Sequence, residues 1–483
     1  MIRAHVYILK LLGSSSEHFI YVFATMISAA IHFIFSIYIK IYVMPYEYGI
    51  YVSCTILQTY LAYMQLGTLN AFNRDYSQLI GACNDVLAKK YRNTVFTFLL
   101  VIFSVILVLV IIILCVVNYK ITIDPRYSCG FLFGALIIFL TMIENFGSFR
   151  TRIDSGFKYI SFVILFELLS VAVGAYLLVH IGYYSIYLTA MASLIIGIFL
   201  YWKNSYSDIK LGIDKVLLKT ILLSGLPLLI NSLIWTVVNS IDKIVILLFL
   251  DTESLGLYGI AQNAFSYMIL IPAAMSQLFY ANMGKIFGTS NDVSKLNSVS
   301  ITYTTIISMV TSVIAMVAFY LFPIFVQNVM PNYSEGIAAA QIMIIGLSVY
   351  AATMVNGNIL TLLKKNAAII RSSVYMCVLN IVCSIGFVII IGKNIESVAL
   401  GTAATYTIGS IIIIIQLKSY AGINIIKLIN ASILPVLIAV IPGVLLYQTQ
   451  LNKLIGLFCT LLIAMVYYVI FYKKTIVGLI NKT

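Results

Sequence analysis

Residues 239–251 read NSIDKIVILLFLD and place an acid and a base, Asp242 and Lys243, side by side in an otherwise apolar run. If this run crosses a membrane, each charge costs about 2.5–3.5 kcal/mol near the centre of the helix. Adjacent residues on a helix point in different directions, so the two side chains cannot easily bridge each other. Lys243 therefore either faces a cavity, where it attracts an anionic ligand, or joins an interhelical salt bridge.

Two more carboxylates fall within apolar runs, Glu144 and Glu167. Each either pairs with a lysine or carries a coupling proton or sodium ion, and Asp242 is a third candidate for that coupling role. His32, in the first apolar run, is either a satisfied polar residue or part of a proton relay.

Basic residues gather at the ends of apolar runs, at Arg74, Arg150, Arg152 and Lys158. They serve either as ordinary positive-inside anchors or as a basic funnel that collects an anionic headgroup. Together with Asp242, Lys243 and His32, we take Arg74, Arg150 and Lys158 as candidate ligand-binding residues.

The composition that surrounds these residues is that of a membrane protein. Of 483 residues, 62% are hydrophobic and only 9% are charged, against about 25% in soluble proteins, and mean hydropathy is +1.06. Windows such as 95–118 and 176–201 contain no charge and are long enough to cross about 30 Å of hydrocarbon. No short apolar core followed by a cleavage site occurs at the start, so we expect the first span to stay in the mature protein.

The hydropathy pattern predicts an all-α polytopic protein with about fourteen spans. The seventh is too long for one straight crossing and contains Ser224-Gly225-Leu226-Pro227, which predicts a bent or interrupted helix. The predicted spans are 19–40, 48–70, 95–118, 130–149, 159–180, 183–202, 218–250, 255–281, 300–326, 337–362, 371–391, 397–417, 429–447 and 452–472.

Charge and cysteine patterns narrow the class further. Most of the 29 Lys and Arg residues fall in the tails and in the loops after even-numbered spans, which predicts that both termini are cytoplasmic. The net charge of +13 is mostly this topology signal, because no base-contacting module appears, and we expect no nucleic-acid partner. The seven cysteines show no spaced cluster, so we predict no metal site.

A repeat divides the chain into two similar halves. Gly49-Ile50-Tyr51 opens the second span and Gly256-Leu257-Tyr258 opens the eighth. Six spans separate the two elements, which is an even number, so both halves have the same orientation. The sequence therefore predicts a parallel repeat about an axis along the membrane normal.

These motifs resemble the polysaccharide-transporter branch of the MOP (MATE-like) superfamily. The resemblance rests on S-G-L-P-L-L-I…W…I-D-K-I-V-I…L-G-L-Y-G-I-A in residues 224–261, M-P-Y-E-Y-G-I-Y at 44–51, Leu66-Gly67 followed by Asn73-Arg74, P-N-Y-S-E-G-I-A-A-A at 331–340 and K-N-I-E-S-V-A-L-G-T at 393–402. Lys243 stands where the family usually has arginine, which keeps the charge and loses the planar fork.

The nearest members resemble Wzx-type flippases of O-antigen or capsule repeat units. The resemblance implies two six-helix bundles, at 1–205 and 206–420, two additional helices at 421–483, and a cavity that opens alternately to each side. It also implies undecaprenyl-diphosphate-linked oligosaccharide as substrate, the bacterial inner membrane as location, membrane lipids as surroundings, and a polysaccharide polymerase and chain-length regulator as candidate partners. On this account Lys243 attracts the diphosphate or an acidic sugar.

Three rival functions remain. A cation-coupled multidrug exporter of the same fold calls for more acidic residues near mid-membrane than Glu144, Glu167 and Asp242, and a lipid II-type flippase shares the fold and a basic cavity. A membrane polymerase usually needs a large loop with catalytic residues, and the expected external loops are short. We therefore expect a transporter without catalytic residues or an organic cofactor.

Overall fold

The computed structural model describes residues 2–121, 124–154, 156–290, 292–449 and 452–480, and throughout these ranges the regular structure is helical. This confirms the all-α polytopic class. The helices are α1 Ile2–Tyr42, α2 Pro45–Leu61, η1 Ala62–Gln65, α3 Thr68–Ala71, η2 Phe72–Tyr76, α4 Ser77–Gly81, α5 Asp85–Lys120, α6 Pro125–Asp154, α7 Phe157–Ile181, α8 Tyr184–Tyr201, η3 Trp202–Tyr206, α9 Lys215–Val238, α10 Ile241–Phe249, α11 Thr252–Ser290, α12 Val293–Val329, η4 Pro331–Gly336, α13 Ile337–Leu362, α14 Asn366–Ile390, α15 Ile395–Ala421, α16 Ile425–Gln448 and α17 Lys453–Ile480.

Polar side chains mark where several of these helices begin. Asn84 caps α5 by accepting a hydrogen bond from the backbone N–H of Leu87, and Asp292 caps α12 in the same manner. Asn394 caps α15 through the backbone N–H of Ser397. Such caps satisfy donors that the first helical turn leaves free, so short connections suffice between long apolar helices.

The number of spans differs from the predicted fourteen. Among the described residues, twelve helices are long and apolar enough to cross a membrane, and a thirteenth span results if the two bent segments of α9 are counted as one. The predicted second span, 48–70, is not among them, because α2 ends at Leu61 and shorter helical pieces follow. The predicted count of fourteen is therefore not confirmed.

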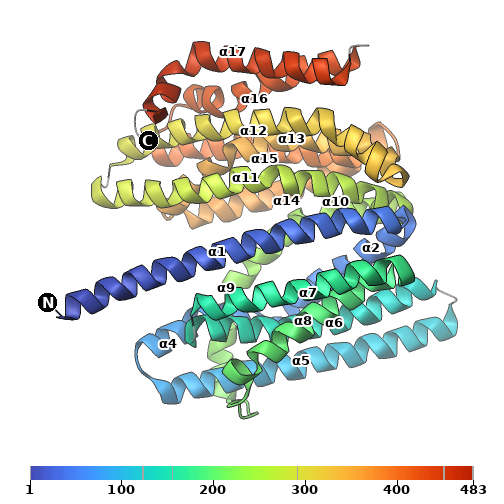
Figure 1. The fold of residues 1–483 in the computed structure, drawn as a ribbon, viewed down its shortest axis with the longest axis vertical. Coiled ribbons are helices and arrows are strands. Elements are labelled where there is room, and N and C mark those ends of the chain that lie inside the picture. The colour runs from blue at the N-terminus through green and yellow to red at the C-terminus, as the bar shows by residue number, and fades with distance from the viewer. Residues whose placement is uncertain (1, 122–123, 155, 291, 450–451, 481–483) are drawn as a thin grey trace. The chain divides into compact units, whose positions relative to one another are not determined.

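Contacts divide the chain into an N-terminal unit, Met1–Leu233, and a C-terminal unit, Ile234–Thr483. In the N-terminal unit, α7 packs against both α1 and α8, while α6 packs against α5 and α8 (Figure 1). In the C-terminal unit, α13 contacts α11, α12 and α15, and both α16 and α17 pack on α12 (Figure 1). The predicted boundaries at 205/206 and 420/421 stay predictions.

Small residues let helices approach closely in both units. A methyl group on Gly174 of α7 would meet the Thr189 hydroxyl of α8, and one on Gly346 of α13 would meet Ala403 of α15. Close backbone approach of this kind is how helices associate in a lipid environment, where the hydrophobic effect between helices is weak.

Candidate functional site

The seventh predicted span is interrupted at Asn239 and Ser240, between α9 and α10. Side chains satisfy the polar groups that the break exposes: Asn380 donates to the carbonyl of Val238 at 2.9 Å, and Tyr406 donates to the Asn239 side-chain oxygen at 2.9 Å. The Ser240 hydroxyl donates to the carbonyl of Thr236 at 2.8 Å. A helix broken at membrane depth is tolerated only with such partners, so this interruption is a built feature.

Asp242 and Lys243 lie in the first turn of α10, directly after the break. Asp242 is 3% exposed and accepts hydrogen bonds from the Tyr258 hydroxyl at 3.0 Å and the Gln262 amide at 3.4 Å, both on α11. It also accepts from the backbone N–H of Lys243 at 2.9 Å. The hydrogen bonds from Tyr258 and Gln262 connect α10 to α11 through Asp242. A carboxylate is also favourable at this position, because it lies at the N-terminus of α10.

Lys243 differs from its neighbour in having no such partners. Its ammonium forms neither a hydrogen bond nor an ion pair with any described residue, although the Asp242 carboxylate acts on it through space. The side chain is half-buried. The contact between helices is therefore made by Asp242, and the Lys243 charge remains available to a ligand.

The N-terminal unit contains an interruption of its own, in the second predicted span. After α2 and η1, Leu66 and Gly67 adopt left-handed backbone angles, with φ of 52° and 80°. The chain then continues through α3 and the π-helical η2. Interrupted helices at membrane depth are typical of substrate sites in secondary transporters.

Two glycines of the motifs hold this interruption in place. A methyl group on Gly67 would lie 2.4 Å from the carbonyl carbon of Gly225, and one on Gly225 would lie 2.2 Å from the carbonyl oxygen of Gly67. The two backbones are therefore in direct contact. Nearby, the Ser224 hydroxyl donates to Asp75 at 3.3 Å, which adds a polar contact to the same junction.

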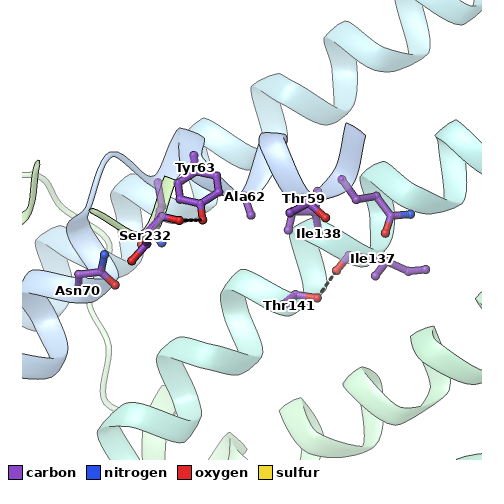
Figure 2. A pocket seen from close by; sticks show the side chains of 10 residues that line it. Thr59, Ala62, Tyr63, Asn70, Ile137, Ile138, Thr141 and Ser232 are labelled. Carbon is purple, nitrogen blue, oxygen red and sulfur yellow. Dashed lines mark hydrogen bonds between the residues drawn. The ribbon is translucent and has the colours of Figure 1, made fainter. Parts of the chain in front are cut away.

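A cavity of about 330 Å³ opens beside the interrupted second span. Figure 2 shows Tyr63, Asn70 and Ser232 along one side, and Thr59, Ile137, Ile138 and Thr141 along the other. Tyr63 donates to the carbonyl of Ser232 at 3.0 Å. We call this cavity the amide pocket; its lining residues are Gln58, Thr59, Ala62, Tyr63, Gln65, Asn70, Ile137, Ile138, Thr141 and Ser232.

A second cavity, of about 430 Å³, shares Ile137 and Thr141 with the amide pocket. His32 lines it from α1, and its Nδ1 lies 2.8 Å from the carbonyl oxygen of Ser28. Hydroxyl groups of Ser170 and Ser193 also line this cavity. The candidate relay residue thus lines a cavity whose surface is mostly apolar, with a few hydroxyl-bearing residues among the lining.

The structure brings Glu144 and Glu167 together, from α6 and α7. Gly197 of α8 makes the room: a methyl group there would lie 2.3 Å from Oε1 of Glu167 and 3.3 Å from Cγ of Glu144. Neither carboxyl group forms a hydrogen bond with a described residue. Two carboxyl groups that share a site can hold a common proton, which is the chemistry that coupling needs.

The basic candidates differ in how many hydrogen bonds and ion pairs they already form within the protein. Arg150 is 6% exposed and donates to Asp154 at 3.0 Å, to Asp208 at 2.6 Å and to the carbonyl of Ser205 at 2.6 Å. This hydrogen bonding by Arg150 holds the pKa of Asp208 below its usual value. Arg92 binds the same carboxylate at 2.7 Å, so the Arg150 cluster joins α5, α6 and the segment after η3.

Two other basic candidates are more accessible. Arg74 is paired with the adjacent Asp75 at 2.5 Å, and its side chain is 45% exposed. Lys158 is exposed on the first turn of α7. These two can meet an anionic headgroup more readily than Arg150 can.

Several residues at these sites escaped the sequence analysis. Lys40, near the end of α1, was not among the candidates, yet it is 1% exposed and its ammonium lies 4.2 Å from the centre of the Tyr48 ring. The amides of Gln58, Asn70 and Gln262 carry no formal charge, and formal charge was the signal that selected the candidates. Uncharged amides within apolar runs are also costly in a membrane and were a usable signal.

Comparison with known proteins identifies the family and the fold. Residues 42–330 match the model of a family described as polysaccharide biosynthesis protein. No curated protein matched the chain.

Solved structures with a similar fold include a lipid II flippase, MurJ, in an inward closed conformation, with 17% identity and a TM-score of 0.72 over 94% of this chain and 99% of that one. They also include an inward-facing multidrug resistance MATE family transporter of the MOP superfamily, with 14% identity and a TM-score of 0.65 over 82% and 95%. A MOP superfamily transporter from Pyrococcus furiosus has 15% identity and a TM-score of 0.54 over 83% and 94%.

Proposed function

The chain belongs to the family of polysaccharide biosynthesis proteins, and from this premise we propose that it is a flippase for lipid-linked oligosaccharides. Its substrate would be an undecaprenyl-diphosphate-linked repeat unit of O-antigen, capsule or another surface polysaccharide. The protein would carry this unit from the cytoplasmic to the outer face of the bacterial inner membrane by alternating access, with both termini in the cytoplasm.

The observation that carries the proposal is this family match in a chain that is built almost wholly of membrane helices. The longest described connection between helices runs only from residue 207 to residue 214. A synthetic enzyme of this family would need room for a catalytic domain, whereas a transporter needs only the helices. The fold shared with a lipid II flippase and with MATE transporters agrees with transport.

We assign the diphosphate to Lys243. Its ammonium forms no ion pair with a described residue, and it lies directly after the α9–α10 interruption. An ammonium binds phosphate as a point charge, and in a site of low dielectric this attraction is stronger than in water. Arg74 and Lys158 would gather the headgroup beforehand, while Arg150 acts through the structure it holds. A polymerase and a chain-length regulator would receive the flipped unit.

Deleting the gene tests the function directly. We expect the deletion strain to lose its surface polysaccharide and to accumulate single repeat units on undecaprenyl diphosphate, trapped on the cytoplasmic face. Mass spectrometry of extracted lipids, with membrane-impermeant labelling of the sugar, measures both. Normal polysaccharide would contradict the proposal. Accumulated lipid II instead would identify a lipid II-type flippase, and altered drug resistance alone would identify an exporter.

Glu144 and Glu167 are our candidates for coupling to a proton gradient. Replacing either by glutamine keeps the shape of the side chain and removes the titratable carboxyl group, so we expect transport driven by a pH gradient to fall about tenfold or more. Flux of a fluorescent lipid-linked sugar in proteoliposomes, with and without the gradient, measures this. Glu253→Gln, at an exposed carboxylate in the first turn of α11, is the matched control. If transport by the Glu144→Gln and Glu167→Gln variants depends on the pH gradient as it does in the unmodified protein, the two glutamates do not couple transport to protons.

A further inference from the structure

The amide pocket contains two side-chain amides whose hydrogen-bonding capacity is not used. The Gln58 nitrogen Nε2 is buried without a hydrogen-bond partner, and the Asn70 amide forms no hydrogen bond with any described residue. An unpaired polar group in a membrane segment costs free energy, because neither water nor lipid can satisfy it. An unsatisfied buried group in a folded protein calls for an explanation, and a ligand that supplies the missing partner is one.

The space for the Gln58 amide is provided by a neighbouring helix. A methyl group on Gly134 of α6 would lie 2.4 Å from Nε2 and 2.9 Å from Cγ of Gln58. The amide therefore packs directly against the backbone of α6, one turn before the lining residues Ile137 and Ile138. The Gln58 side chain therefore packs closely against α6 on one side and lines the amide pocket on the other.

The chemistry of the lining is polar without charge. The lining combines amides and hydroxyls from Gln58, Asn70 and Thr141 with apolar surface from Ile138 and the ring of Tyr63, and no residue in the lining is an acid or a cationic base. An amide offers a donor and an acceptor side by side, which matches the hydroxyl groups of a sugar. The apolar surface matches the C–H face of a sugar ring, on which aromatic side chains stack.

We infer that the amide pocket binds an uncharged sugar of the lipid-linked substrate. The inference rests on the proposed function and deepens it, because it separates recognition of the sugar, at Gln58 and Asn70, from recognition of the diphosphate, at Lys243. A volume of about 330 Å³ is near the lower end of the range for small-molecule pockets, about 300–1,000 Å³. The pocket therefore holds a small saccharide, and a uronic acid finds no cation there.

The test compares three soluble probes on the purified full-length protein. They are farnesyl diphosphate, farnesyl diphosphate linked to a neutral disaccharide, and farnesyl diphosphate linked to a disaccharide that contains glucuronic acid. Isothermal titration calorimetry gives the Kd for each. We expect the neutral glycolipid to bind about tenfold or more tightly than bare farnesyl diphosphate, and more tightly than the acidic one.

Variants then locate the effect. Gln58→Leu and Asn70→Leu should each weaken binding of the neutral glycolipid about tenfold and leave bare farnesyl diphosphate unchanged. Gly134→Ala keeps Gln58 and displaces its amide, so it should act in the same direction. Gln78→Leu, at an exposed glutamine of α4 outside the pocket, is the matched control. Size-exclusion chromatography confirms that each variant is folded.

The outcomes separate the two proposals. Equal binding of the neutral glycolipid and bare farnesyl diphosphate, with Lys243 still required for both, overturns the sugar site and leaves the flippase standing. Preferred binding of the acidic glycolipid also overturns the sugar site. Absence of binding to all three probes by the unmodified protein overturns the proposed function, and the sugar site with it.

Discussion

Lys243→Ala is expected to abolish transport of the lipid-linked oligosaccharide, with a loss of about a hundredfold or more. Truncating one partner of a buried, hydrogen-bonded charge pair costs about 2–5 kcal/mol, and each 1.4 kcal/mol is a factor of ten. Lys243 meets this condition when a phosphate is bound, because its ammonium forms no ion pair with a described residue that the phosphate would have to replace. Flux of a fluorescent undecaprenyl-diphosphate-linked sugar in proteoliposomes measures the effect.

Three variants distinguish substrate binding from a structural role of Lys243. Lys243→Arg keeps the charge and should retain most of the transport, while Lys393→Ala, at an exposed lysine after α14, should retain all of it. If Lys243 instead forms a salt bridge, the double change Asp242→Asn with Lys243→Gln should rescue what a single change destroys. Full activity of Lys243→Ala at a normal protein level would show that this residue does not bind the diphosphate.

Gly67→Ala is expected to prevent the N-terminal unit from folding normally. At a φ of 80° a side chain costs about 1–3 kcal/mol, and the added methyl group would also lie 2.4 Å from the carbonyl carbon of Gly225. Backbone cannot move aside as a flexible side chain can, so overpacking adds about 1–3 kcal/mol. This total is a large part of the stability of a typical domain. Yield of monodisperse protein and its apparent Tm measure the loss.

Gly225→Ala tests the same contact from the other side. Gly225 lies within α9, so alanine should be acceptable to its own helix, and any loss comes from the approach of Gly67 alone. Gly386→Ala in α14 is the matched control, because no atom within 4 Å would meet its methyl group. A Gly225→Ala protein as stable as the control would mean that the two backbones separate at little cost.

The sequence predicted the helices well because long uncharged runs have few other stable arrangements in a membrane. It also predicted an irregularity in the seventh span, from Pro227. The actual gap between α9 and α10 depends on Asn380 and Tyr406, which lie more than a hundred residues away and could not be paired with it by local pattern. The irregular end of the second span was missed for a similar reason, since its partner Gly225 is equally distant in sequence.

The candidate site was only partly accessible to the same reasoning. Charge in an apolar run was enough to select Lys243, Glu144 and Glu167. It was not enough to show that the two glutamates meet beside Gly197, or that the donors of Arg150 are occupied by Asp154 and Asp208. Sequence spacing specifies which face of one helix a residue occupies, but it does not specify which other helix packs there.

The contact between Gly67 and Gly225 has a mechanical consequence. Most helix contacts contain side chains that change rotamer and so absorb a small shift. Here the two backbones are in direct contact and no side chain lies between them, so a displacement of Gly225 displaces Gly67 as well. Gln65 and Asn70, which line the amide pocket, lie within three residues of Gly67. A movement of the first half of α9 is therefore expected to move Gly67 with it and to change the shape of the amide pocket.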